Sequence, residues 1–313
     1  MATEQQVVFT SADARYMPGA LVSLYTALQH THAKTFIVVT SAPDSEWLSP
    51  RIYSLFEERG AQLIAVESAS LPLDTMLGAT QRFPEEAFAR FFADDLPVGD
   101  ASRALYIDSD VMVMGNLDSL LDYDLGDRCL GAAPDIHAIA KGKLLKQQQR
   151  IGLSSSDVYL GSGVLLIDLA RYRQSSLRDQ IASTLTERAG HLIYPDQDAL
   201  NLSDRSQIKV LNPCHNFPPG LWRLLSPVEQ ERITILHFYD GNKPWGDRAH
   251  RVPLDLIERY DKSAELLGLS AAITSDRPTP IRSHSQAYTR KYWLENVLRQ
   301  TEARRAISQW LDT

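Results

Sequence analysis

Short apolar runs alternate with helix-periodic segments over the first 70 residues, and this alternation constrains the fold more than any other feature. Runs of strand length occupy residues 7–10, 36–39 and 63–66. Between them, apolar residues recur at helical spacing over residues 17–28 and 48–56; Pro43-Asp44-Ser45 offers a start for the second helix and Gly60 an end. Such alternation predicts a mostly parallel sheet built from right-handed crossovers. No glycine fingerprint follows the first run, which argues against a dinucleotide-binding domain.

A further apolar run, residues 104–107, ends at two carboxylates one residue apart, Asp108 and Asp110. In an extended segment, residues i and i+2 point the same way. Two carboxylates aimed at one spot repel each other unless a cation lies between them. Open α/β sheets place their ligands at the carboxyl ends of strands. The stretch therefore predicts a divalent metal site.

The Asp-x-Asp pattern occurs three times, so pattern alone also allows a solvated turn. The other copies are Asp122/Asp124 and Asp196/Asp198. Only Asp108/Asp110 follows a hydrophobic strand and resumes into apolar residues. Context favours this pair as the metal site.

Composition and charge exclude several classes of protein. The chain has 313 residues, 44% of them hydrophobic, and a net charge of −7. This is the composition of an ordinary soluble globular protein, and the acidic balance argues against a nucleic-acid partner. Cys129 and Cys214 match neither a zinc spacing nor a disulfide framework. Without a signal-peptide pattern or a long apolar run, we expect a cytoplasmic protein that contacts membranes only at their inner surface.

Three polar clusters lie further along the chain. Gly161, Ser162 and Gly163 leave little side-chain bulk before an apolar strand, which suits close approach of a ligand but also a plain turn or bulge. Asp196, Gln197 and Asp198 open a helix after Pro195, where Asp196 is also a candidate N-cap. His237 ends the apolar run 233–236, and Lys243 follows six residues later, a combination that suits a metal-bound phosphate, although a lone strand-end histidine is more often structural.

The C-terminal part divides by composition. We expect a catalytic domain over residues 1–268, a linker rich in Ser, Thr and Pro over residues 269–286, and an amphipathic helix over residues 287–313. That helix either packs on the main domain or contacts a membrane surface or a partner. The sequence does not fix the oligomeric state.

Four motifs stand in order: Tyr-Ile-Asp-Ser-Asp at 106–110, Gly-Ser-Gly-Val-Leu-Leu-Ile at 161–167, Asp-Gln-Asp-Ala-Leu-Asn at 196–201, and His-Phe-x-x-Gly-x-Lys-Pro-Trp at 237–245. Together they resemble glycosyltransferase family 8, which includes bacterial lipopolysaccharide galactosyl- and glucosyltransferases and glycogenin. The resemblance covers roughly residues 7–250. It implies an α/β GT-A fold with a mixed, mostly parallel sheet, a UDP-hexose donor, a saccharide or glycolipid acceptor, Mn²⁺ or Mg²⁺, and retention of anomeric configuration.

The resemblance also carries roles to single residues. Asp108, Asp110 and His237 look like the metal ligands, and Lys243 like the lysine that contacts the diphosphate. Arg90 resembles the arginine near the donor sugar, Asp135 and Asp196 the carboxylates that hold sugar hydroxyls, and Gln197 the glutamine near the anomeric carbon. The remaining residues implied in donor or nucleotide binding are Thr10, Asp13, Tyr16, Ser109, Gly161, Ser162, Gly163 and Gly241.

An amide oxygen is a far weaker nucleophile than a carboxylate, so Gln197 favours front-face attack through an oxocarbenium-like species. Three departures from the family pattern put the exact sugar in question: Gly161 stands where Asn is common, Ala14 replaces an Asn near the ribose, and Asp240 shifts the glycine of the last motif. Two alternatives stay open, a glycogenin-like self-glucosylating protein and a non-catalytic nucleotide-sugar-binding subunit.

Overall fold

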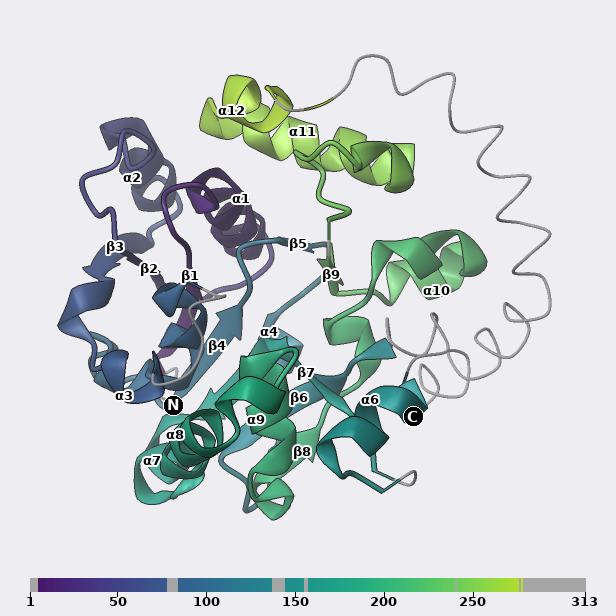
Figure 1. Cartoon of the computed structure of the whole chain (residues 1–313). Helices are drawn as coiled ribbons and strands as arrows, with labels where there is room; N and C mark the ends of the chain where they lie inside the picture. Colours follow the sequence, from purple (N-terminus) through teal and green to yellow (C-terminus); the bar gives the residue numbers. More distant parts are fainter. Residues whose placement is uncertain are drawn as a thin grey trace.

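A seven-stranded mixed sheet forms the centre of the computed structural model, which describes residues 5–77, 84–136, 144–154, 157–239, 241–275 and 277 (Figure 1). The strand order is β3-β2-β1-β4-β7-β6-β8. Neighbours are parallel except at β7, which runs antiparallel to both β4 and β6. The strands are β1 (Gln6–Ser11), β2 (Thr35–Thr40), β3 (Gln62–Glu67), β4 (Arg103–Ile107), β6 (Leu130–Pro134), β7 (Leu160–Asp168) and β8 (Ile208–Val210).

Helices cover both faces of the sheet, and successive residues of β4 enter two separate apolar cores. Leu105 and Ile107 pack with residues from α1, α2 and α11, whereas Ala104 and Tyr106 pack with residues from α8 and α9. The helices are α1 (Met17–Leu28), α2 (Pro50–Glu57), α3 (Asp74–Leu77), α4 (Asp118–Leu121), α6 (Leu144–Ile151), α7 (Leu169–Gln174), α8 (Leu177–Glu187), α9 (Pro195–Leu202), α10 (Pro227–Glu231), α11 (Leu254–Leu267) and α12 (Ser270–Thr274).

The predicted α/β class with a mostly parallel sheet is confirmed. The predicted start of α2, at Pro43-Asp44-Ser45, was wrong. The helix begins at Pro50, behind an extended Ser49 with ψ of 158°. Proline is preorganised for the first helical position, and Pro50 lies closer along the chain to the apolar residues Ile52 and Phe56 than Pro43 does. Gly60 adopts a left-handed φ of 65° just beyond the helix, as expected of a terminating glycine.

The C-terminal part is described only as far as Arg277. Residues 270–274, inside the expected linker, form α12, and the side chain of Ile273 is buried against the main core. The expected helix over residues 287–313 lies outside the described residues. Within the described ranges, no helix combines the length and apolar character needed to cross a bilayer.

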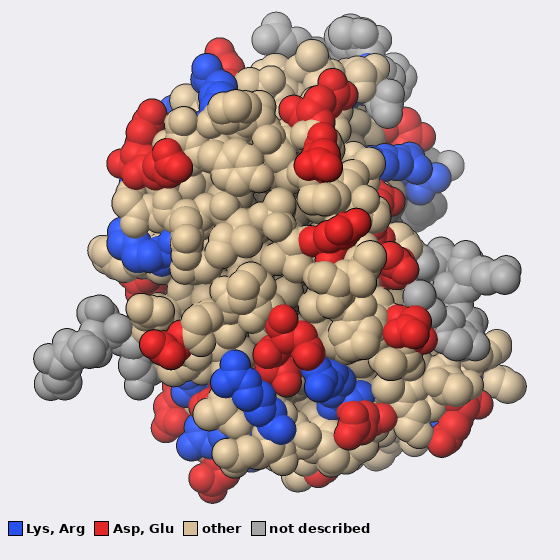
Figure 2. All heavy atoms as spheres, turned by 90° about the vertical axis from the view of Figure 1, so that its left-hand side faces the viewer, with Lys and Arg blue, Asp and Glu red and all other residues tan. Residues whose placement is uncertain are grey.

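Acidic and basic side chains are interspersed on the surface. Figure 2 shows the face over β3 and α2, where Lys and Arg do not merge into a continuous basic area among the described residues. This distribution agrees with the net charge of −7.

The topology brings the polar strand ends to one edge of the sheet. Asp108 follows the carboxyl end of β4, and the antiparallel β7 places its amino end beside it, with Ile107 opposite Val164. The backbone N–H of Asp108 donates to the carbonyl of Gly163 at 2.8 Å. On the other side of β7, Pro134 at the end of β6 pairs with Leu160, so Asp135 reaches the same edge.

Candidate active site

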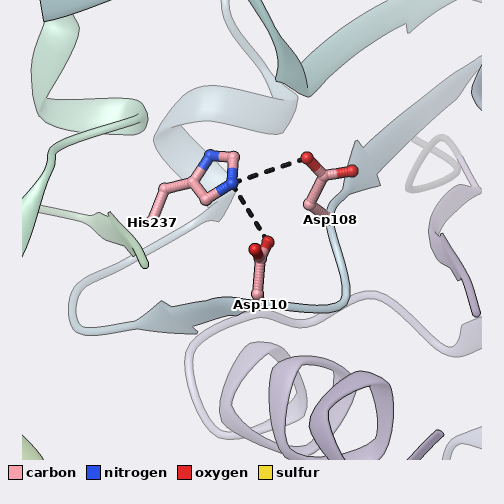
Figure 3. Close-up of side chains that lie close together, drawn as sticks. All are labelled: Asp108, Asp110 and His237. Carbon is pink, nitrogen blue, oxygen red and sulfur yellow. Dashed lines mark ion pairs between the residues drawn. The ribbon is translucent and has the colours of Figure 1, made fainter. Parts of the chain in front are cut away.

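Asp108, Asp110 and His237 converge on one spot at this edge (Figure 3). Each offers one ligand atom, and these atoms lie within 4.8 Å of one another. His237 Nε2 is 3.0 Å from Asp110 Oδ1 and 3.5 Å from Asp108 Oδ2. Among the described residues this is the one cluster of three such side chains with that geometry.

A small second sheet brings His237 to the two carboxylates. The chain turns after β4 into β5 (Val111–Val113), which pairs antiparallel with β9 (Ile235–His237). Val111 lies opposite His237, so the last residue of β9 stands beside Asp110. The apolar run that ends in a histidine is therefore a strand, and its register sets the third side chain of the cluster.

Lys243 completes the charge balance around Asp110. Its ammonium forms an ion pair with Asp110 Oδ2 and donates to the carbonyl of Phe238 at 2.7 Å. Burial acts to raise the pKa of Asp110, but the charges and hydrogen bonds of Lys243 and His237 outweigh it and hold that pKa well below its usual range. Asp110 is therefore ionised at neutral pH, as a metal ligand must be.

The donor set and the space around it fit a divalent cation. Two carboxylates and one imidazole are a ligand combination that Mn²⁺ accepts. Gly163 lies against the cluster: a Cβ at this position would be 2.3 Å from His237 Cε1 and 2.6 Å from Asp108 Oδ2. The absent side chain at 163 is thus what allows the histidine and the carboxylate to approach.

Arg90 joins this cluster to the next group of predicted residues. It lies in a 3-10 helix (Glu85–Phe91) and is almost fully buried. Its Nη2 is 3.0 Å from Asp108 Oδ1, and its Nη1 is 2.8 Å from Asp196 Oδ2. Burial alone would lower the pKa of Arg90, but Asp108, Tyr106 and Asp196 outweigh it and raise the pKa above its ordinary value. Arg90 remains a fixed cation between two carboxylates.

Ser162, Asp196, Gln197 and Asp135 form a connected polar group. Ser162 Oγ donates to Asp196 Oδ2 at 2.6 Å, and Gln197 Nε2 donates to Asp135 Oδ2 at 3.0 Å. The backbone N–H of Ser162 reaches Gln197 Oε1 at 3.4 Å. The Gly-Ser-Gly stretch is part of β7 rather than a turn. Residue 162 faces this polar group, whereas Gly163 lies against His237 and Asp108, and Gly161 lies against Asn216.

The three Asp-x-Asp copies have different structural settings. Asp122 and Asp124 are exposed, and Asp124 accepts from the backbone of Gly126 in a surface turn. Asp198 is fully buried and binds Arg150, Tyr159 and the backbone N–H groups of residues 193 and 194. Asp196 does not cap its helix, since the N-cap position is Tyr194.

The other predicted donor-binding residues are more scattered. Asp13 accepts from the backbone N–H of Tyr16 at 2.8 Å, and the ring of Tyr16 meets Trp245 edge-on. Thr10 Oγ1 is buried at the end of β1 without a partner among the described residues. Ser109 is half-buried between the two carboxylates. Gly241 lies against Arg248.

Sequence patterns missed residues that support the cluster from behind. Tyr106 donates to Asp108 Oδ1 at 2.6 Å and also contacts Ser11 Oγ. Tyr239 stacks on His237 with ring centroids 3.9 Å apart, and Asn216 Oδ1 lies 2.8 Å from His237 Nδ1. Tyr106 lies two residues before Asp108, and Tyr239 lies two residues after His237. This spacing could have indicated from the sequence that both tyrosines lie near the cluster. Asn216 follows no recognisable motif.

A seven-stranded mixed sheet with helices on both faces, and an Asp-x-Asp pair where the central strand ends, define the GT-A class of glycosyltransferases. The sequence profile of Glycosyl transferase family 8 matches residues 7–249. The chain therefore belongs to glycosyltransferase family 8.

Curated relatives cover most of the described chain at low identity. Glycosyltransferase GlyF of Streptococcus pneumoniae is 24% identical over 249 residues, which are 76% of this chain and 56% of GlyF. A lipopolysaccharide 1,2-glucosyltransferase of Escherichia coli is 22% identical over 247 residues, 74% of this chain and 70% of that protein. The chain thus spans little more than half of the length of GlyF.

Solved structures share the fold. The galactosyltransferase LgtC, crystallised with donor and acceptor sugar analogs, aligns with a TM-score of 0.67 and 24% identity, covering 83% of this chain and 95% of LgtC. The glycosyltransferase GlyE of Streptococcus pneumoniae aligns with a TM-score of 0.59 and 22% identity, covering 88% of this chain and 66% of GlyE.

Proposed function

We propose that the chain is a retaining, metal-dependent hexosyltransferase that moves galactose or glucose from a UDP-sugar to a saccharide or glycolipid acceptor. The observation that carries this proposal is the convergence of Asp108, Asp110 and His237, with Lys243 beside them, in a chain of this family. A cation site and a positive side chain together stabilise the charge of a leaving nucleoside diphosphate.

Asp108, Asp110 and His237 would hold Mn²⁺ or Mg²⁺. The bound ion would supply Lewis-acid stabilisation of the charge that develops on departing UDP. With the ion in place, Asp110 has a second cationic partner, and Lys243 becomes available to the diphosphate. Its ammonium is a point charge on a flexible stem, so it can move from a carboxylate to a phosphate oxygen without rearrangement of the backbone.

The polar group around Asp196 suits the donor hexose. Arg90 fixes Asp196 and Asp108 relative to each other, so the sugar and the diphosphate would be held in one rigid frame. Asp135 and Asp196 are the hydrogen-bond acceptors for sugar hydroxyls. Ser162, whose hydroxyl donates to Asp196, would be the side chain of the Gly-Ser-Gly stretch that contacts the donor sugar.

We propose a front-face mechanism with retention. Gln197 is held by Asp135 and by the backbone of Ser162, and these two contacts fix its amide within the polar group of Ser162, Asp196 and Asp135. An amide is a poor nucleophile, so Gln197 would stabilise an oxocarbenium-like species electrostatically rather than bond to it. Leaving UDP and the attacking acceptor hydroxyl would then share one face of the sugar.

The proposal for the acceptor and the cellular location rests on general features of such enzymes. Acceptor pockets form from variable loops and C-terminal parts. A cytoplasmic enzyme at the inner membrane face, contacting it through residues 287–313, would meet glycolipid acceptors.

The decisive experiment is a donor screen that measures UDP release from UDP-glucose and UDP-galactose with Mn²⁺, with and without EDTA. Asp110→Asn should abolish the release of UDP that depends on Mn²⁺, because it removes a charged ligand of the ion. Asp124→Asn, in the exposed copy of the same pattern, should leave the release unchanged. Full activity of Asp110→Asn would refute the metal assignment, and metal-dependent UDP binding without any hydrolysis or transfer would favour a binding subunit.

A further inference from the structure

A buried asparagine lies directly behind the histidine of the metal-ligand cluster. Asn216 follows a 3-10 turn (Pro213–His215), and its side chain has no exposed surface. Its Oδ1 is 2.8 Å from His237 Nδ1, although 21 residues separate the two along the chain. The opposite ring nitrogen, Nε2, faces Asp110 and Asp108.

This contact selects one tautomer of the imidazole. The amide oxygen of Asn216 can only accept a hydrogen bond, so Nδ1 must carry the proton. The lone pair that binds a metal is then on Nε2, on the side of the two carboxylates. We propose that Asn216 is a positioning residue that fixes the tautomer and the ring orientation of His237 for metal coordination; this inference rests on the proposed function.

The surroundings of Asn216 support a directed role. The ring of Tyr239 stacks on His237 with an interplanar angle of 22°, so the imidazole is held from its face as well as from Nδ1. Gly161 provides the space: a Cβ at this position would be 2.6 Å from Asn216 Nδ2. The two glycines of the Gly-Ser-Gly stretch therefore have related roles, one admitting Asn216 and the other admitting His237.

Folding stability alone does not account for this asparagine. Asn216 Nδ2 is buried without a hydrogen-bond partner among the described residues, which disfavours the folded state. Reversing the amide would bring Nδ2 against Nδ1 and force the proton onto Nε2, which would block coordination. The observed orientation leaves one amide donor unsatisfied and keeps a proton on Nδ1, so Nε2 is the nitrogen that faces the carboxylates and would bind an ion once its own proton is lost.

Two variants separate an acceptor role from simple packing. Asn216→Leu retains bulk but cannot accept, whereas Asn216→Asp keeps an acceptor oxygen in the same place. Binding of Mn²⁺ in the presence of UDP is measured by the electron paramagnetic resonance signal of the free ion. We expect Asn216→Leu to bind Mn²⁺ about 10- to 100-fold more weakly, as for loss of other partners behind a metal ligand, and Asn216→Asp to bind at least as well as wild type.

The matched control is Asn212→Ala, which removes the cap of the same turn, where Asn212 Oδ1 accepts from Cys214 N at 2.9 Å. It should lower stability and leave Mn²⁺ affinity unchanged. Equal Mn²⁺ affinity of folded Asn216→Leu and wild type would overturn the inference, as would equal losses in the leucine and aspartate variants. Failure of the wild type to bind Mn²⁺ and UDP would instead overturn the proposed function.

A second measurement needs no metal and reads the wild-type protein directly. In protein labelled with ¹⁵N-histidine, long-range proton–nitrogen spectra report which ring nitrogen of His237 carries a proton, and His237→Gln assigns the signal. We expect a protonated, exchange-protected Nδ1 in the metal-free wild type. A bare Nδ1 in that spectrum would contradict the hydrogen bond to Asn216 on which the inference depends.

Discussion

Arg90 forms a buried ion pair with Asp196, with 2.8 Å between Nη1 and Oδ2. The same guanidinium reaches Asp108 through its other amino group at 3.0 Å. One cation therefore serves a carboxylate of the proposed metal site and a carboxylate of the proposed sugar site. Disturbance of either site is expected to reach the other through Arg90.

Arg90→Met should destabilise the fold by about 3–5 kcal/mol, because two carboxylates lose their buried partner. Arg90→Lys keeps the charge but not the planar fork, so it should restore only part of that loss. Arg178→Met is the control, since Arg178 also holds two carboxylates, Asp94 and Asp95, but is about a third exposed; its loss should be about 0–1 kcal/mol. Urea unfolding measures all three, and similar losses for Arg90→Met and Arg178→Met would contradict the role of burial.

Gly163→Ala should abolish Mn²⁺-dependent UDP binding, because the added methyl group would overlap His237 and Asp108. Overpacking also predicts a stability loss of about 1–3 kcal/mol. Gly190→Ala introduces the same group where nothing lies within 4 Å and should change neither property. Titration of UDP with and without Mn²⁺ distinguishes the variants, and normal metal-dependent binding by Gly163→Ala would show that the cluster does not need this space.

Gln197→Ala should lower the turnover number by about 10- to 100-fold, the equivalent of a hydrogen bond to a charged group of about 1.5–3 kcal/mol. The variant keeps Asp135 and Asp196, so its KM for the donor should change little. Mass spectrometry of wild-type enzyme quenched during turnover should show no hexose attached to the protein. A covalent hexosyl adduct on any residue of this pocket would refute the front-face mechanism.

Asp198→Ala should destabilise the protein by about 3–5 kcal/mol, because it leaves Arg150 and two backbone N–H groups without their buried acceptor. Tyr159→Phe removes one donor to the same carboxylate, and its loss should be nearer 1 kcal/mol. Asp122→Ala, at an exposed site, should stay within about 0.5 kcal/mol of wild type. Chemical denaturation provides the comparison, and a neutral Asp198→Ala would exclude the structural role.

Stability should fall with pH below about 6.5, in part because of His215. Burial lowers the pKa of His215 to about 4, whereas the unfolded chain binds a proton near the ordinary value. Between these values the unfolded state holds more protons, so the free energy of unfolding drops by at most about 1.4 kcal/mol per pH unit as pH decreases. Urea unfolding at pH 5 and pH 7 tests this, and His215→Gln should reduce the slope; an unchanged slope would assign it to other groups.

Strand ends are readable in the sequence, and for this reason Asp108 and Asp110 were expected at one edge of the sheet, whereas the family resemblance implied that His237 joins them. Asp108 and His237 each follow an apolar run, and a run that stops at a polar residue marks the edge of a sheet. The direction of β7 was not readable, because its uninterrupted apolar run fits a strand of either direction. The prediction of the start of α2 failed for a related reason. Pro43 and Pro50 are both suitable first residues of a helix, and only the tertiary fold selects Pro50.

Asn216 marks the limit of prediction from the sequence. Its contact with His237 depends on the pairing of β9 with β5 and on an isolated bridge between Phe217 and Leu236. Neither relationship leaves a local pattern, and an asparagine after a proline-containing turn is ordinary in loops. Residues that support a site from behind are therefore found only when the packing is known.

The pairing of β5 with β9 has a consequence for resistance to unfolding. Asp110 and Lys243 meet although they are 133 residues apart, and the two strands beside them have three residues each. A bound ion and nucleotide would bind the folded state, in which these segments meet, and not the unfolded chain, so occupancy would favour the folded state. The enzyme with bound nucleotide-sugar should consequently have a higher unfolding temperature and greater resistance to proteases than the ligand-free enzyme.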